Sequence, residues 1–159
     1  MHTPTHNNRA ALPTARLSQP QPVIDAAAAL QAITGALHQA QTLGLTVNIA
    51  VVDASGVLAA FVRMPGAPLH SIDIAIDKAY TAVSFGLATG QWHEALQQHT
   101  PAVRDGLVRR PRFVGFGGGL PIVEDKRRIG AIGVSGASEA QDDIIARAGL
   151  QALGLSPAL

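Results

Sequence analysis

Apolar residues recur every three or four positions in three stretches of the chain, the spacing typical of an amphipathic helix. These stretches are residues 23–43, 71–86 and about 138–153. Ser71 is expected to cap the second helix, because a serine side chain can accept a hydrogen bond from a free amide at a helix start. Ser138 and Gln141 match the capping-box pattern and mark the start of the third.

Runs rich in β-branched and aromatic residues predict five strands. They cover residues 47–52, 57–62, 113–116, 120–124 and 129–134. The first two strands flank a tight turn at Asp53, and the last two flank a charged turn, so each pair is expected to form a hairpin. Asp53 is expected to hold its turn by local hydrogen bonds. Arg63, at the end of the second strand, is interpreted as a neighbour of Asp53 or as a clamp for a ligand carboxylate.

Three segments lack a periodic pattern. Residues 1–21 are polar and contain prolines, which predicts a flexible arm ahead of one domain of residues 22–159. Thr89 is expected to cap a short helix ending near residue 96, and residues 99–111 are interpreted as irregular surface chain. Helices before, between and after antiparallel strands indicate an α+β domain, with helices packed on an antiparallel sheet.

The composition is 47% hydrophobic and only 14% charged. Such a chain buries a core and leaves little charge for its surface, so we expect other copies of the chain to cover part of that surface in a homo-oligomer. The formal net charge of +1 does not favour binding to nucleic acid or to an anionic membrane. The N-terminal residues hold no apolar stretch typical of a signal peptide or membrane span, so the expected compartment is the cytoplasm.

Several chemistries are disfavoured by residue type and spacing. The chain has no cysteine, which excludes disulfides, thiolate ligands and cysteine nucleophiles. Its histidines lack zinc-motif spacing, so no metal site is predicted, and its serines lack a nucleophile-elbow motif. The glycine run at residues 115–119 does not match a dinucleotide-binding pattern. We expect these glycines to serve backbone conformation, with an anion nest as the less favoured alternative.

Glycines 130, 133 and 136 alternate with apolar residues in a predicted strand. They are expected to let a helix or a second subunit come close, with ligand contact as the alternative. Lys78 lies near two aspartates at helical spacing. Two interpretations carry equal weight: Lys78 belongs to a solvated ion pair, or it is a partly buried lysine with a shifted pKa. His70 precedes a helix in a loop rich in proline and glycine, and it is either a solvated residue or one that faces a pocket.

The motifs of the chain, taken together, resemble a known family. They are residues 51–56, 63–68, 71–75, 78–82 with Phe85, 118–123, 129–137, 141–142 and 146–149. In this combination the chain resembles the GlcG/HbpS family of small haem-binding proteins, whose relatives include the C-terminal domain of PduO-type corrinoid adenosyltransferases. The resemblance covers about residues 23–153.

The resemblance implies a profilin-like α+β fold, with a central antiparallel sheet of about five strands flanked by helices and assembly into oligomers that are often octameric. It also implies haem as a cofactor, since haem binding is the described activity of some members. Lys78 and Thr81 are the matched positions associated with the family's site, and His70 lies just upstream. Gly118, in the matched glycine motif, is also predicted to contact the cofactor. Without a secretion signal, the chain is similar to the cytoplasmic GlcG-like branch.

Three hypotheses remain open, and the first two differ on whether the protein is an enzyme. The first is an oligomeric small-ligand-binding protein for haem or a related tetrapyrrole, with His70, His93 or His99 as axial donor; Trp92 beside His93 offers a flat apolar surface. The second is an enzyme of small-molecule catabolism, with Lys78 or His70 as acid or base and Arg63 holding a carboxylate. A structural assembly partner with no polar pocket is a third alternative.

Overall fold

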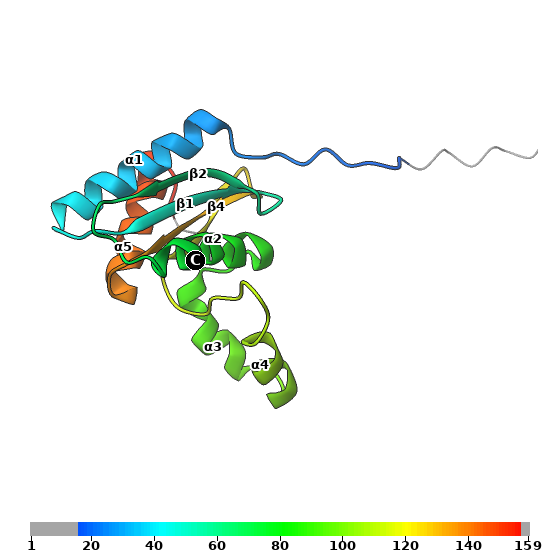
Figure 1. Ribbon diagram of the computed structural model, residues 1–159. Helices are drawn as coiled ribbons and strands as arrows, with labels where there is room; N and C mark the ends of the chain where they lie inside the picture. The colour runs from blue at the N-terminus through cyan, green and yellow to red at the C-terminus, as the bar shows by residue number, and fades with distance from the viewer. Residues whose placement is uncertain (1–15, 157–159) are drawn as a thin grey trace, which may run out of the picture.

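A four-stranded antiparallel sheet forms the centre of the computed structural model, which describes residues 16–156 (Figure 1). In spatial order its strands are β2 (Leu58–Arg63), β1 (Asn48–Asp53), β4 (Arg127–Ser135) and β3 (Gly119–Glu124). Both predicted hairpins are confirmed. One Asp53 carboxylate oxygen accepts hydrogen bonds from the amides of Ser55 and Val57, at 2.8 and 3.0 Å, so Asp53 holds its turn as expected.

The strand predicted at residues 113–116 is wrong, and the described residues form four strands rather than about five. The Phe113 amide donates to the Arg110 carbonyl at 3.2 Å, and two other amides in or just after this segment bind side chains instead of a neighbouring strand. The Val114 amide donates to Thr81 Oγ1 at 3.0 Å, and the Gly117 amide donates to a Glu139 carboxylate oxygen at 3.0 Å. An apolar, aromatic composition predicted a strand here, but these side-chain acceptors fix the segment as an irregular crossing over two helices.

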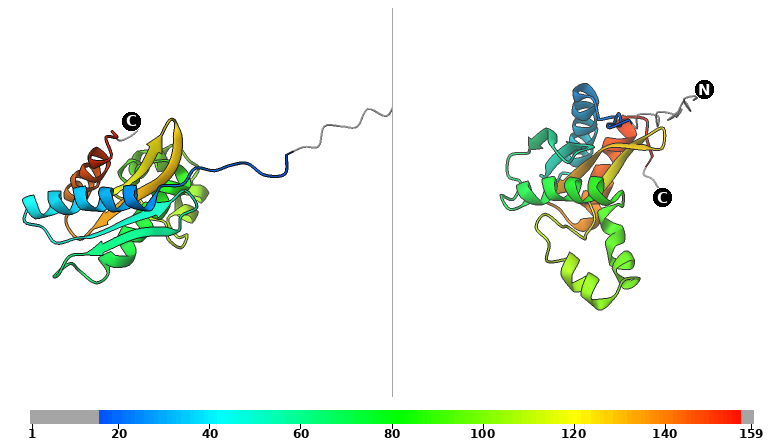
Figure 2. Two further views of the ribbon diagram at one scale, coloured as in Figure 1. Left: turned by 90° about the horizontal axis from the view of Figure 1, so that it is seen from above. Right: turned by 90° about the vertical axis from the view of Figure 1, so that its right-hand side faces the viewer.

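Helices cover both faces of the sheet. Helices α1 (Ala26–Thr42) and α5 (Glu139–Ala152) lie on one face, and α2 (Ser71–Phe85) lies on the other, as the right-hand view of Figure 2 shows. The main core lies between the sheet and the α1/α5 layer. A short 3₁₀ turn, η1 (Thr89–Gln91), leads into α3 (Trp92–Gln97) and α4 (Pro101–Leu107), which project from the body as an arm (Figure 1).

The helix starts agree with the sequence in part. The capping box of Ser138 and Gln141 is confirmed. Ser71 is the first residue of α2 rather than its cap; His70 occupies the cap position and makes no side-chain capping bond. Thr89 likewise caps nothing, because its hydroxyl oxygen accepts a hydrogen bond from the Gly119 amide at 2.8 Å.

The prediction of irregular chain at residues 99–111 is wrong, because α4 lies within it. Pro101 stands in the first turn of this helix after Thr100, an arrangement typical of helix starts since proline lacks an amide that the first turn leaves unpaired anyway. The helix has no buried residue, so the hydrophobic periodicity that reveals other helices is missing.

Glycines let the layers approach closely. A side chain at Gly133 of β4 would overlap the Ala75 carbonyl oxygen of α2, which confirms the expectation that a helix crosses this strand at short range. A Cβ atom at Gly149 of α5 would lie 3.0 Å from the Ala32 carbonyl oxygen of α1. Glycine at these two positions therefore sets the spacing of both helical layers.

The N-terminal segment of residues 1–21, which was predicted to be flexible, is described from residue 16 onward. It contacts the body near its C-terminal end. The Arg127 guanidinium donates to the Pro20 carbonyl at 2.9 Å, and the Ile24 amide donates to the Ile129 carbonyl at 2.8 Å. The rest of that prediction, residues 1–15, lies outside the described residues. Within residues 16–156, every helix is too short or too polar to cross a membrane.

Candidate ligand-binding pocket

A pocket of about 320 Å³ lies where the arm returns to α2. Four side chains of α2 line it: Tyr80, Thr81, Ser84 and Phe85. The opposite wall is Leu107, at the end of α4, together with residues 110–113 that follow the arm. Sites for small molecules are typically clefts with apolar walls and a few polar groups, and this pocket has that character.

An aromatic cluster supports one end of the pocket. The ring centroids of Phe85 and Trp92 are 4.8 Å apart, those of Trp92 and Phe113 are 5.0 Å apart, and both pairs meet edge to face. Such contacts are favourable beyond the area that the rings bury. Because Phe85 and Phe113 both line the pocket, the cluster gives it a rigid apolar base that joins α2 to the returning chain.

Arg112 is held in an unusual backbone conformation beside the pocket. Its φ is 66°, a left-handed value that is rare for residues with a side chain. Three contacts maintain it: its Nε donates to an Asp77 carboxylate oxygen at 2.8 Å, its guanidinium lies 3.6 Å from the Tyr80 ring centroid, and its carbonyl accepts from the Thr81 hydroxyl at 2.9 Å. Strain of this kind, of order 1–3 kcal/mol, often persists at functional sites.

Thr81, predicted as a cofactor contact, lines the pocket but has its hydroxyl engaged. The hydroxyl donates to the Arg112 carbonyl and accepts from the Val114 amide, at 2.9 and 3.0 Å. The residue is 1% exposed. In this structure Thr81 therefore fixes the far wall of the pocket, and its prediction as a direct contact stays a prediction.

Lys78 is fully buried and paired with Asp142 of α5. Its Nζ donates to an Asp142 carboxylate oxygen at 2.9 Å and to the Val134 carbonyl at 2.8 Å. Burial lowers the pKa of Lys78, while the hydrogen bond and opposite charge of Asp142 raise it. Burial likewise raises the pKa of Asp142 against the effect of Lys78. Of the two readings of Lys78, the structure supports the buried one.

The glycine run covers this ion pair. The Phe116 ring lies 4.8 Å from the Lys78 Nζ, and Gly118 has a φ of 113° that favours glycine. A Cβ atom at Gly118 would lie 2.8 Å from the Lys78 Nζ, so a larger residue would displace the ammonium. The glycines thus serve conformation and close approach, as expected. Gly118 faces Lys78, and its role as a cofactor contact stays a prediction.

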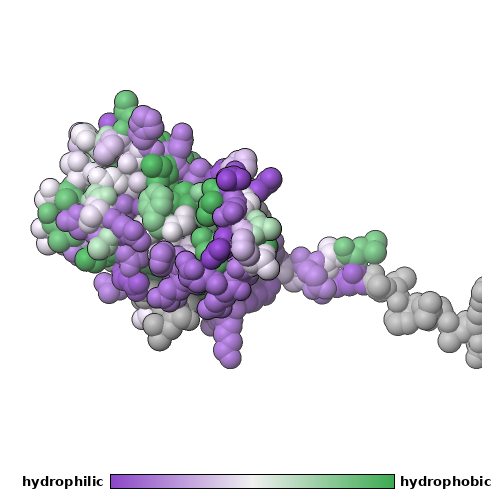
Figure 3. All heavy atoms as spheres, turned by 90° about the horizontal axis from the view of Figure 1, so that it is seen from below, coloured by the Kyte–Doolittle hydropathy of each residue, from purple (hydrophilic) through white to green (hydrophobic). Residues whose placement is uncertain are grey.

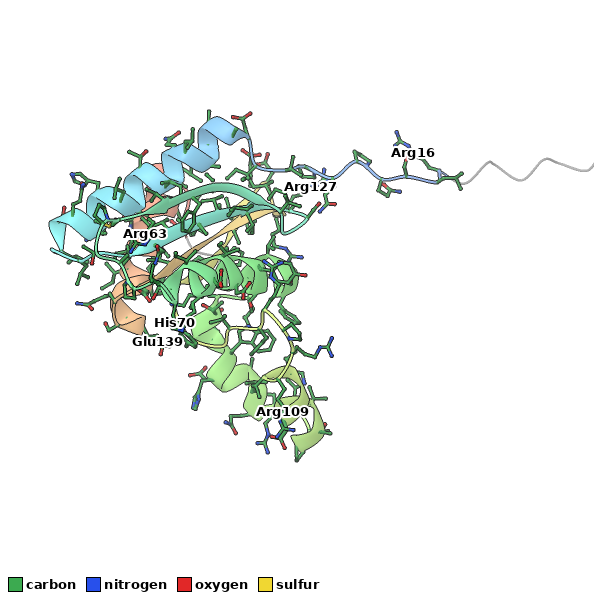
Figure 4. All side chains as sticks on the ribbon, viewed as in Figure 1. Arg16, Arg63, His70, Arg109, Arg127 and Glu139 are labelled. Atoms are coloured by element: carbon green, nitrogen blue, oxygen red, sulfur yellow. The ribbon has the colours of Figure 1, made fainter. Side chains whose placement is uncertain are left out.

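His70 and Arg63 do not line the pocket. His70 is exposed at the start of α2, and Arg63 ends β2, where its guanidinium donates to the Ala67 carbonyl at 2.8 Å. Arg63 pairs in register with Asn48, at the opposite end of the strand from Asp53, so the interpretation of Arg63 as a neighbour of Asp53 is wrong. Figure 4 shows Arg63 and His70 on the body and Arg109 on the distal arm.

The other predicted axial donors also lie outside the pocket. His93 is exposed on α3, and His99 is exposed after that helix. Among residues 16–156 no three histidine, aspartate or glutamate side chains gather in a way that could hold a metal ion.

Sequence reasoning missed the residues that carry most of this geometry. Tyr80, Arg110 and Arg112 line the pocket, and Asp142 neutralises Lys78. One available signal was the basic cluster that ends at Arg112, immediately after a proline. Asp142 offered a weaker signal: it is acidic in the first turn of a helix, where a surface role is the usual interpretation.

The fold and pocket define a small α+β domain, with helices on both faces of an antiparallel sheet and an apolar cleft beside α2. The particular family follows from comparison with known proteins. Residues 24–151 match the family described as "Haem degrading protein HbpS-like", and the chain belongs to this family.

Relatives of known sequence and structure agree with this assignment. The chain is 35% identical over 133 residues to an uncharacterised 15.0 kDa protein from the dhaT-dhaS intergenic region of Citrobacter freundii, covering 84% of this chain and 94% of the relative. It is 30% identical to PduOC, whose structure was solved as a haem complex, with a TM-score of 0.78 and coverage of 86% of this chain and 99% of that one. The structure of HbpS is 33% identical, with a TM-score of 0.78 and coverage of 91% and 99%.

Proposed function

We propose that this protein binds haem or a related tetrapyrrole in the pocket between α2 and the arm. The observation that carries the proposal is the pocket itself: an apolar cleft with an aromatic base and two arginines, Arg110 and Arg112, among its lining residues. The solved haem complex of PduOC, a relative of the same fold, supports this choice of ligand.

The chemistry of the lining residues fits such a ligand. A haem-like tetrapyrrole is flat and largely apolar, and it carries carboxylates at one edge. Phe85, Phe113 and Leu107 offer apolar contact, and within residues 16–156 Arg110 forms no ion pair, so its guanidinium is available to a carboxylate. The volume of about 320 Å³ is near the lower end for ligand sites, so part of a macrocycle would lie outside the pocket.

Hemin titration followed by the Soret band tests the proposal, with two matched variants of α4. Leu107→Glu places a charge in the pocket wall, whereas Val103→Glu adds the same charge to an exposed residue that does not line the pocket. We expect a saturable Soret shift for the native protein, a loss of affinity of about tenfold or more for Leu107→Glu, and native affinity for Val103→Glu. An unchanged hemin spectrum at stoichiometric excess of protein would refute haem binding, and equal affinities of the two variants would refute the site.

We also propose that the protein assembles with copies of itself through the uncovered side of β2. Helix α2 packs over β1, β4 and β3, so it leaves β2 open on that face. Leu58 and Phe61, whose side chains point to that face, are 45% and 36% exposed. Figure 3 shows apolar side chains among polar ones on the surface of the body seen from below. Light scattering should give a mass above one chain for the native protein and a smaller one for Leu58→Lys; a native monomer would contradict the proposal.

The alternative of a catabolic enzyme has less support from the geometry. A general acid or base must come within hydrogen-bonding reach of its substrate, and Lys78 is 0% exposed beneath Phe116. The roles of Lys78, His70 and Arg63 in catalysis therefore stay predictions, as do the octameric state, the profilin-like topology and the cytoplasmic location. Retained turnover in a Lys78→Met variant, once a substrate is known, would exclude Lys78 as acid or base.

A further inference from the structure

The pocket contains few atoms that could bind a metal ion carried by a tetrapyrrole. Histidine, methionine and cysteine are absent from its lining, and side-chain oxygen atoms are present only on Tyr80, Thr81 and Ser84. The Thr81 hydroxyl already makes two hydrogen bonds to backbone groups. Ser84 offers a neutral aliphatic alcohol, which is a weak iron ligand, whereas tyrosine is one of the side chains that ligate haem iron in proteins.

Tyr80 is also held in place on two sides. On one side the Arg112 guanidinium lies 3.6 Å from the ring centroid, and Asp77 fixes that guanidinium through a 2.8 Å hydrogen bond. On another side the β1–β2 turn lies against the ring: a Cβ atom at Gly56 would come within 2.8 Å of both Cδ2 and Cε2. Gly56 has a φ of 80°, so the turn reaches this position because the residue is glycine.

We propose that Tyr80 is the axial ligand of a ferric tetrapyrrole in this pocket, through its phenol oxygen. The inference rests on the proposed haem binding and identifies the donor atom. In the proposed exchange the phenol O–H bond would break and its proton would leave to solvent; an oxygen–iron bond would replace the bond to the water molecule that hemin carries in solution, that water would leave, and the iron would stay ferric. Because the oxygen becomes negatively charged, the neighbouring guanidinium of Arg112 stabilises the bound form, and Asp77 partly offsets that charge.

This assignment differs from the histidine donors expected from the sequence. His70, His93 and His99 are exposed and do not line the pocket, so each would require the pocket residues to rearrange before it reached a ligand there. Tyr80, by contrast, is already one of the lining residues. The two assignments also differ in spectrum, because a phenolate ligand gives ferric haem a charge-transfer band that an imidazole ligand does not give.

The test compares the full-length native protein, Tyr80→Phe, and the triple variant His70→Ala/His93→Ala/His99→Ala, each loaded with hemin. We expect phenolate-to-iron charge transfer and an iron–phenolate stretch by resonance Raman in the native protein and in the triple variant. Tyr80→Phe should lose both signals and bind hemin about tenfold or more weakly. Circular dichroism of each variant checks its fold. The Raman spectrum of the native protein tests the proposal even if a variant does not fold.

The outcomes separate the two proposals. A native protein that binds hemin without a phenolate signal, or a folded Tyr80→Phe variant that keeps that signal, would overturn the role of Tyr80 and leave haem binding intact. Loss of the phenolate signal in the triple histidine variant would also overturn it. A native protein that does not bind hemin would overturn both proposals.

Discussion

The body and the arm of this protein are built in opposite ways. In the body, alanines and glycines let α1, α2 and α5 pack closely on the sheet, and residues such as Ala29, Ala36 and Ala75 are fully buried. In the arm, α4 has no buried residue at all. The pocket lies where the two meet, and its walls come from α2 on one side and the returning arm on the other. A tightly packed body thus supplies a fixed wall, and a loosely packed arm supplies the opposite one.

The largest effect is expected from breaking the ion pair inside the body. Asp142→Asn leaves the Lys78 ammonium buried without its counter-charge, which should lower the free energy of unfolding by about 3–5 kcal/mol. Asp143→Asn is the matched control, because Asp143 pairs with Arg147 near the surface and should cost no more than about 1 kcal/mol. Urea unfolding measures both.

A double replacement sharpens this prediction. Lys78→Met with Asp142→Leu removes both charges and should cost less than Asp142→Asn alone, since an apolar pair leaves no buried charge. A double variant that is less stable than Asp142→Asn would show that the ion pair contributes more to the free energy of unfolding than the mutual neutralisation of its two charges.

A smaller effect is expected from adding one methyl group to a glycine in each region. Gly133→Ala forces the methyl against the Ala75 carbonyl and should destabilise the protein by about 1–3 kcal/mol. Gly106→Ala, in α4, meets nothing within 4 Å and should stabilise that helix by about 0.5–1 kcal/mol. Thermal unfolding of Gly133→Ala and helical content of Gly106→Ala test the pair. Equal effects of the two substitutions would contradict the contrast between body and arm.

Native-state hydrogen exchange should show the same contrast without mutation. Segments with few buried contacts open locally at low free energy, whereas the core opens only on global unfolding. Amides of α4 should therefore exchange faster than amides of β1 and β4, which are the two central strands. Equal protection of α4 and β4 would mean that the arm is covered in solution, for example by another copy of the chain.

The smallest effect expected is a dependence of stability on alkaline pH. Because burial lowers the pKa of Lys78 in the folded state, the unfolded chain binds more protons between that lowered pKa and the ordinary value of 10.5. The free energy of unfolding should rise with pH across this window, relative to a Lys78→Met reference. Parallel stability curves for the two proteins would contradict the lowered pKa.

The sequence predicted the body far better than the arm. The capping box at Ser138 and the turn at Asp53 are local signals, and both are confirmed. Burial on one face also produced the periodicity that revealed α1, α2 and α5. Helix α4 has no such face. The segment at residues 113–116 resembles a strand in composition, but the Val114 amide binds the Thr81 side chain and the amide of Gly117, just after the segment, binds the Glu139 side chain, and both side chains are distant in sequence.

The site was predicted only in part, for the same reason. Lys78 and Thr81 were singled out by the family motif, but the partner of Lys78 is 64 residues away and the contacts of Thr81 are more than 30 residues away. No local pattern predicts such pairings. Tyr80 lies between these two residues in the same motif, yet its importance depends on Arg112 and Gly56, which only the folded chain brings to its ring.

Because the chain has a single tryptophan, its intrinsic fluorescence can report on the pocket. Trp92 is 5% exposed and its ring lies 5.0 Å from that of Phe113, a residue of the pocket wall. All indole fluorescence therefore originates beside the pocket, within short range of anything that enters it. A ligand that absorbs near the indole emission would quench this light by energy transfer, so occupancy can be followed in the native protein without an added label.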